Sequence, residues 1–163
     1  AHEALRDGGM HETRQVADAF VRWLRSKPVD CGNTCLRGLR RYLSDGSLEA
    51  PRNEGDAGNG ALMRNLPVVI ATLFDEAAFE RLSIAQARIT HGHALSDAAV
   101  LGLGRLTRGA LLGATLDELR QQAEDWVARC PAFRFRPYRG RATAFVVDTV
   151  QTVLHHGLGQ ADF

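Results

Sequence analysis

The stretch GDAGNGALMR, residues 55–64, says more about the fold than any other part of this sequence. Three glycines fall within six positions and lead into an apolar run, and no β-strand pattern precedes them. A dinucleotide-binding loop would follow a strand, and a P-loop would end in Gly-Lys-Ser or Gly-Lys-Thr, so neither α/β nucleotide fold is indicated. The stretch predicts a glycine-rich loop that leads directly into a helix.

Apolar residues recur at helical spacing on both sides of this stretch. Before it, helices are predicted around residues 16–24, ended by Ser26-Lys27-Pro28, and over residues 34–43. After it, they are predicted over residues 61–74, 76–89, 96–112, 115–128 and 142–156, although the β-branched run of the last would also suit a strand. Ser96 is the expected N-cap of its helix, with Asp97 in the first turn, and residues 115–118 have capping-box spacing. An all-α fold is predicted.

Length and composition indicate one compact domain. The 163 residues are 45% hydrophobic and 24% charged, which is ordinary globular usage, and residues 44–60 and 130–140 read as irregular loops. A net charge of +1 gives no reason to expect nucleic acid or anionic lipid as a partner. The longest apolar stretch, residues 66–74, is too short for a membrane segment.

Three cysteines without a CxxC pair favour the cytoplasm. Because the chain begins with Ala-His and ends just after a helix, we expect the central part of a longer domain, residues 1–163, incomplete at both ends.

Two segments could contribute to a ligand-binding site. The glycines of residues 55–60 would let the backbone approach phosphate closely, although a glycine-rich turn with no ligand explains them about as well. Between the first two helices, Asp30 could act as a general base or ribose ligand and Asn33 as its hydrogen-bonding partner. Taken alone, each of these two is better explained as a helix N-cap.

Several other features have a plain structural explanation beside a functional one. His91 and His93 flank a glycine, and a ligand contact by His91 is favoured over a metal pair. The alternating aromatics and arginines of residues 133–138 could stack on a nucleobase, but a loop fixed to the core is favoured. The others are expected to be surface or packing residues: His155, His156, Arg37, Arg40, Arg41, Cys31 and Cys35.

The segments GDAGNGALMR, THGHALSDAA and AFVVDTVQTVLH, in this order, resemble the ADP-ribosylglycohydrolase family, and KPVDCGNTCLRGLRRY extends the resemblance. It implies an all-α hydrolase that cleaves the N-glycosidic bond between ADP-ribose and an arginine of a target protein, with dinitrogenase reductase as the expected target. It also implies a catalytic role for Asp30. The ligand-binding residues it implies are Asn33, Glu54, Gly55, Asp56, Ala57, Gly58, Asn59, Gly60, His91, Tyr138 and Phe145. Phe145 stands where close relatives carry a tyrosine, so a hydroxyl contact is lost there.

The family also uses two metal ions, magnesium or manganese, held by a Thr-Asp-Asp-Thr-Glu motif before this region and an Asp-x-Asp-Thr-Thr motif after it. Neither motif occurs in this sequence, so we expect no metal ligand in this chain and no activity from it alone. The same gap supports a second hypothesis, a non-catalytic ADP-ribose binding or regulatory module. A third is a helical interaction protein without a ligand. Binding of a nitrogen-signalling regulator stays open.

Overall fold

A computed structural model describes the backbone of residues 2–159 and the side chains of residues 12–159. Every regular element over these residues is helical, which confirms the predicted all-α class. The elements are α1 (His2–Arg25), α2 (Asn33–Asp45), the short 3-10 helix η1 (Glu54–Asp56), α3 (Gly60–Met63), α4 (Leu66–Ala71), α5 (Glu76–Arg88), α6 (Ala94–Leu111), α7 (Leu116–Arg129), the 3-10 helix η2 (Pro131–Phe133) and α8 (Val146–Leu158).

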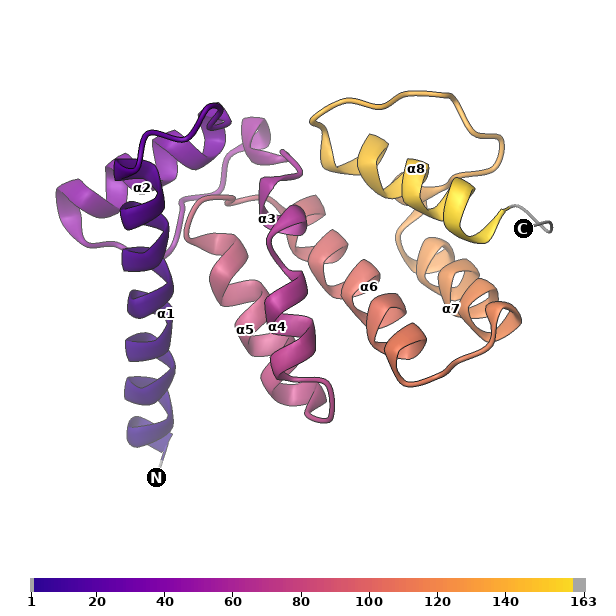
Figure 1. Cartoon of the computed structure of the whole chain (residues 1–163), viewed down its shortest axis with the longest axis horizontal. Coiled ribbons are helices and arrows are strands. Elements are labelled where there is room, and N and C mark those ends of the chain that lie inside the picture. Colours follow the sequence, from indigo (N-terminus) through magenta and orange to yellow (C-terminus); the bar gives the residue numbers. More distant parts are fainter. Residues whose placement is uncertain (1, 160–163) are drawn as a thin grey trace.

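Helix α6 lies at the centre of the arrangement. It contacts α3, α4, α5, α7 and α8, while α1 packs against α2 and α5 at one side of the molecule (Figure 1). The larger apolar core lies around α6, α7 and α8 and includes the fully buried Phe133. A smaller core joins α1 and α2 to Ile89, at the end of α5. The loops that carry the candidate site residues run over the ends of these helices.

Glycines on α6 allow its neighbours to pack close to its backbone. A Cβ atom on Gly102 would lie 1.9 Å from the indole of Trp126 on α7, and one on Gly104 would lie 2.5 Å from the ring of Phe79 on α5. Neither contact is possible for real atoms, so glycine is required at both positions. This close packing fixes α5 and α7 on opposite faces of the helix that supports the site.

The helix predicted over residues 61–74 is divided into α3 and α4. The break falls at Arg64 and Asn65, just before Pro67, which lies in the first turn of α4. Asn65 is buried, and its amide donates to Val100 O at 3.1 Å while its oxygen accepts from Gln86 at 3.1 Å. These side-chain bonds attach the break to α6 and α5. The periodicity of the segment is helical on both sides of it, which is why the sequence pattern did not reveal the division.

Two predicted helix starts are wrong and one is confirmed. The N-cap of α6 is His93, whose Nδ1 accepts from Leu95 N at 3.0 Å. Ser96 is instead buried and donates to Asp56 O, because the helix begins a turn earlier. The last helix begins at Val146 rather than near residue 142, since the N–H of Val146 bonds to Ala57 O at 2.9 Å. The capping box of α7 is present, with Thr115 as its N-cap.

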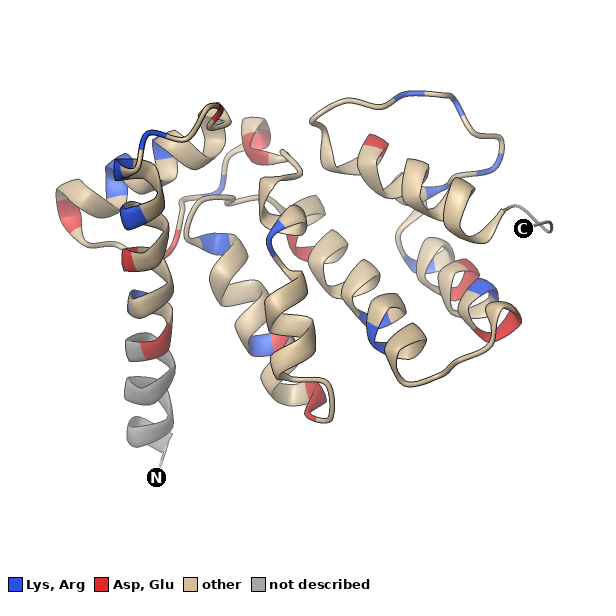
Figure 2. Ribbon diagram, viewed as in Figure 1, with Lys and Arg blue, Asp and Glu red and all other residues tan. Residues whose placement is uncertain are grey.

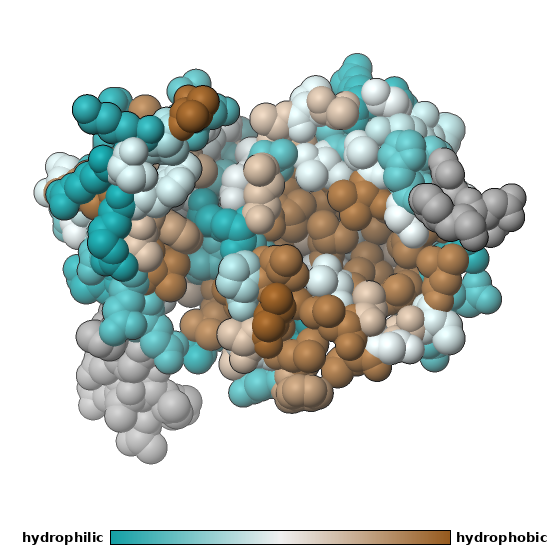
Figure 3. Space-filling model, viewed as in Figure 1, coloured by the Kyte–Doolittle hydropathy of each residue, from teal (hydrophilic) through white to brown (hydrophobic). Residues whose placement is uncertain are grey.

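One face of the molecule exposes apolar side chains. Figure 3 shows hydrophobic surface over α4 and the middle of the molecule. The exposed large apolar residues of α3, α4 and the turn that follows are Met63, Leu66, Ile70 and Phe74. None of the helices between residues 2 and 159 combines the length and apolar character that crossing a membrane requires.

Candidate functional site

Residues 30–33 lie at the start of α2, and no side chain among them caps that helix. Its N-cap is Gly32, and no side-chain cap bond is formed, so the interpretation of Asp30 and Asn33 as N-caps is wrong. Both side chains belong to exposed residues. Burial and the neighbouring Cys35 and Asp30 raise the pKa of the Cys31 thiol, which favours its protonated form. Because Asp30 and Asn33 are exposed and do not cap the helix, a ligand can reach both side chains.

Residues 53–60, which we call the glycine loop, are held by buried polar contacts. Asn53 caps η1 by accepting from Gly55 N at 2.8 Å. Asp56, in the middle of this loop, is 4% exposed and forms an ion pair with Arg37 of α2. Arg37 and Arg41 were predicted as solvated surface residues, but both make structural contacts. Arg37 pairs with Asp56, and Arg41 donates to Ile89 O at 2.8 Å. The ion pair attaches the start of the glycine loop to α2.

The end of the glycine loop is attached to α8. Gly58 forms an isolated antiparallel bridge with Phe145. The backbone N–H of Asn59 donates to Ala144 O at 2.8 Å, and its side-chain amide donates to Thr149 Oγ1 at 2.9 Å. The loop therefore spans from α2 to α8, two helices that lie far apart in the sequence.

His91 supports the glycine loop from beneath. It is 1% exposed, and its Nδ1 lies 2.7 Å from Thr90 Oγ1. A Cβ atom on Gly58 would lie 3.3 Å from its Nε2, and one on Gly60 would lie 3.2 Å from its Cε1. Burial, with the charges of Arg64 and Arg37, lowers its pKa to about 3. The ring is therefore neutral near pH 7 and lies directly against two glycines.

His93 has a different role. Its Nδ1 caps α6, and its Nε2 lies 3.3 Å from Glu54 Oε2 at the surface. Among residues 12–159, no group of three or more His, Cys, Asp or Glu side chains is placed to hold a metal ion. Asp56, the buried carboxylate of the glycine loop, is already paired with an arginine. The side chains that the structure describes therefore do not fit a dinuclear metal centre.

A hollow of about 660 Å³ lies where these segments meet, and we call it the large hollow. It brings together six of the predicted site residues: Asp30, Asn33, Gly58, Asn59, Gly60 and His91. The others that line it are Phe20, Trp23, Cys31, Gly32, Thr34, Cys35, Leu39, Met63, Arg64, Thr90 and Ala144. Its volume is within the range of ordinary small-molecule sites.

Six other predicted residues do not line the large hollow. Glu54 and Gly55 are exposed, and Asp56 and Ala57 are buried within the glycine loop. Tyr138 stacks on His155, with ring centroids 4.3 Å apart, and bonds to Thr152 Oγ1 at 2.9 Å. Phe145 is 43% exposed and lines a second hollow instead.

Arg64 lines the large hollow, and the sequence analysis gave it no role. Its guanidinium donates to Gln86 O and Thr90 Oγ1, both at 2.8 Å, and lies over the ring of Phe20 at 4.5 Å. Burial lowers its pKa. No carboxylate pairs with it in the part of the chain with described side chains. Its only signal in the sequence was an arginine directly after the short apolar run of α3.

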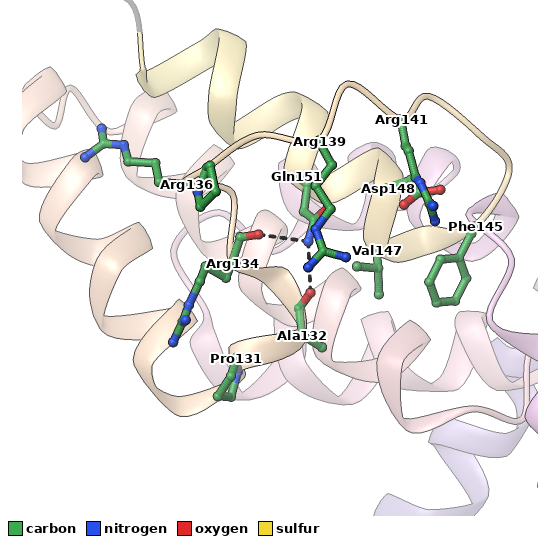
Figure 4. A pocket seen from close by; sticks show the side chains of 11 residues that line it. Pro131, Ala132, Arg134, Arg136, Arg139, Arg141, Phe145, Val147, Asp148 and Gln151 are labelled. Carbon is green, nitrogen blue, oxygen red and sulfur yellow. Dashed lines mark hydrogen bonds between the residues drawn. The ribbon is translucent and has the colours of Figure 1, made fainter.

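The second hollow, of about 500 Å³, lies beside residues 130–145, which we call the arginine loop (Figure 4). Phe133 and Phe135 are buried beneath it, at 0% and 5% exposure, so the favoured interpretation of a loop fixed to the core is confirmed. The aromatic rings are not available to stack on a nucleobase. Gln151 of α8 donates to Ala132 O and Arg134 O and holds the loop in place.

Comparison with known proteins assigns the family. The sequence profile of the ADP-ribosylglycohydrolase family matches residues 1–161. Over 153 residues the chain is 49% identical to ADP-ribosyl-[dinitrogen reductase] glycohydrolase of Rhodospirillum rubrum. That alignment covers 94% of this chain and 52% of the relative, so the chain spans about half the length of the curated relative it matches. By its sequence profile, its helical fold and this relative, the chain belongs to the ADP-ribosylglycohydrolase family.

Proposed function

We propose that this chain supplies the ADP-ribose side of a site that hydrolyses the N-glycosidic bond between ADP-ribose and an arginine of a target protein. The observation that carries the proposal is the meeting of Asp30, Asn33, residues 58–60 and His91 around one hollow. These residues come from segments that the fold alone brings together. The relative's name gives dinitrogenase reductase as the modified protein, and we propose the same target here.

Each part of the large hollow suits one part of ADP-ribose. The guanidinium of Arg64 donates to Gln86 and Thr90 but has no carboxylate partner among the described side chains. It offers a positive charge to the diphosphate, in an apolar setting where charge interactions are strong. Residues 58–60 allow close approach of the ribose, and His91 presents a neutral ring beneath them. Phe20 and Trp23 provide apolar surface for the adenine ring. Asn33 stands at the rim as a hydrogen-bonding group.

Asp30 is the proposed catalytic residue. In the reaction, the bond between the ribose carbon and the arginine nitrogen breaks, water oxygen bonds to that carbon, and a proton passes to the leaving guanidine. Asp30 lines the large hollow with an exposed carboxyl group, where it can move a proton to or from the reacting groups. We propose Glu54, Gly55, Asp56, Ala57, Tyr138 and Phe145 as supports of the glycine loop and its surroundings rather than direct ligand contacts.

We further propose that residues 1–163 form the central part of a single domain. The two metal ions of the family, magnesium or manganese, would then be held by residues outside this chain. The three free cysteines favour a cytoplasmic protein. A nitrogen-signalling regulator is a further proposed partner.

Calorimetric titration of this chain with ADP-ribose, with and without manganese, tests the binding half of the proposal. We expect saturable binding that Asn33→Ala weakens about tenfold, through loss of one hydrogen bond. Arg40→Ala, an exposed position of α2 outside the large hollow, is the matched control and should bind normally. A folded chain that does not bind ADP-ribose under either condition would contradict the proposal.

Release of ADP-ribose from modified arginine tests the catalytic half, in the whole protein. Asp30→Asn should abolish release while ADP-ribose still binds. Binding without release by the unmutated whole protein would instead support the non-catalytic ADP-ribose module.

A further inference from the structure

The second hollow is surrounded by positive charge. Arg134, Arg136, Arg139 and Arg141 all line it, and all four are exposed. Figure 2 shows these basic positions along the loop before α8. Arg136 lies 3.5 Å from Glu124 of α7, but no ion pair involves the other three among the side chains that the structure describes. Three guanidinium groups are therefore available to an anionic partner.

The fold holds these arginines in place. The backbone of the arginine loop is bonded to α8 by Gln151 at one end and by Thr152, which donates to Arg141 O at 3.1 Å, at the other. Between these bonds, Tyr138 stacks on His155. Figure 4 shows Arg139 and Arg141 extending from one limb of the loop, and Arg134 and Arg136 from the other. Because the loop is already ordered, a partner does not have to order it on binding.

The chemistry of the second hollow favours separated carboxylates over one compact anion. Asp148 lines the hollow and is 8% exposed, with Thr143 donating to its Oδ2 at 2.6 Å. A phosphate bound inside the hollow would share it with this carboxylate, and like charges repel. Carboxylates bound one by one to the exposed guanidinium groups would avoid it. Separated carboxylates of this kind are found on the surface of an acidic protein segment.

The position of the second hollow relates it to the large hollow. Ala144 lines the large hollow and the next residue, Phe145, lines the second one, so the two are separated by the strip that pairs with the glycine loop. A protein resting on the arginines would lie beside the proposed ADP-ribose seat. We propose that the arginine loop is a docking surface for an acidic segment of the target protein, next to its modified arginine. The identity of the partner rests on the proposed function.

Matched peptides test this surface. Two peptides of equal length carry one ADP-ribosylated arginine, flanked either by Asp and Glu or by Asn and Gln, and a third is acidic but unmodified. Their affinity for this chain is measured by fluorescence anisotropy at low and high salt. We expect the acidic modified peptide to bind about five- to tenfold tighter than the neutral one at low salt, and high salt to remove the difference.

Substitutions in the arginine loop test whether the preference for the acidic modified peptide depends on its arginines. Arg139→Glu combined with Arg141→Glu should remove it, and the milder Arg139→Gln with Arg141→Gln should reduce it, with circular dichroism confirming that both are folded. Arg40→Glu makes the same kind of charge change on α2 and should keep the preference. Equal binding of the two modified peptides, or a preference that survives the double glutamate variant, would overturn the docking surface. Arginine-dependent binding of the acidic peptides to which ADP-ribose adds nothing would support the surface and overturn the proposed function.

Discussion

The glycine loop and the arginine loop pack against each other but are stabilised in opposite ways. The glycine loop is held by buried polar groups: the ion pair of Asp56 with Arg37, the amide of Asn59, and the neutral ring of His91. The arginine loop is fixed by buried aromatic rings, and its charges point to solvent. Buried polar groups cost much free energy when they lose a partner, whereas exposed charges cost little. Substitutions should therefore disturb the glycine loop through its charges and the arginine loop through its apolar contacts.

The largest expected effect is on the apolar support of the arginine loop. Phe133 is fully buried, with its ring centroid 5.0 Å from that of Trp126. Phe133→Ala should lower the free energy of unfolding by about 3–4 kcal/mol, because it leaves a cavity in the larger core. Phe145→Ala, at a 43% exposed position of the same loop, should cost under about 1 kcal/mol. Urea denaturation of both variants measures the difference, and equal losses would contradict the account of this loop.

The next largest effect on the free energy of unfolding is expected from Arg37, which contacts the glycine loop, and it is compared with that of Arg139 in the arginine loop. Arg37→Ala leaves the buried carboxylate of Asp56 without its cation and should cost about 2–3 kcal/mol, less than a fully buried pair because Arg37 is half exposed. Arg139→Ala removes an exposed arginine that has no ion pair among the described side chains, and it should cost under about 0.5 kcal/mol. Thermal unfolding of the two variants measures both losses of stability. A small loss for Arg37→Ala would show that Asp56 does not depend on its cation.

Much of the fold was predictable because local signals decide it. Apolar periodicity gave the helix class and most helices, and Thr115 with Glu118 gave the start of α7. The errors lie where a distant partner competes with a local signal. Ser96 is a good N-cap by type, but it bonds to Asp56 O, forty residues away in the chain. The start of α8 depends on Ala57 O in the same way, and no pattern near residue 142 carries that information.

The candidate site was predictable only in part. The resemblance to the family pointed to Asp30, residues 58–60 and His91, and the fold brings these together around the large hollow. Arg64 was not predicted, because an isolated arginine looks like any surface arginine until the structure shows it lining a hollow with no ion-pair partner among the described side chains. The prediction that the arginine loop is fixed to the core is confirmed, but which of its arginines form an ion pair depends on the acidic residues that lie nearby in space. Spatial pairing of charges is not visible in one sequence.

The buried His91 gives the stability of the glycine loop a dependence on pH. Its pKa is about 3 in the folded chain and close to the ordinary 6.5 when unfolded. Below pH 6.5 the unfolded chain therefore binds a proton that the folded chain does not, and stability falls with pH down to about pH 3. Between pH 7 and pH 5 the loss from this group is about 2 kcal/mol. His91→Gln should flatten this part of the curve in urea unfolding, and His156→Gln, exposed on α8, should not. An unchanged slope in His91→Gln would mean that the ring can be protonated in place.

The smallest expected effect is on ligand binding, and it rests on the proposed function. A Cβ atom on Gly60 would lie 3.0 Å from Cys35 Sγ and 3.2 Å from His91 Cε1, so Gly60→Ala must displace one of these walls of the large hollow. ADP-ribose affinity should fall about tenfold, or about 1.4 kcal/mol, because the loop no longer fits against its support. Gly157→Ala on α8 is the control, since its Cβ meets no atom within 4 Å. Calorimetry on both variants gives the comparison. If Gly60→Ala binds ADP-ribose as the parent chain does, the close contact of the loop with His91 serves packing alone, and the ligand lies elsewhere in the hollow.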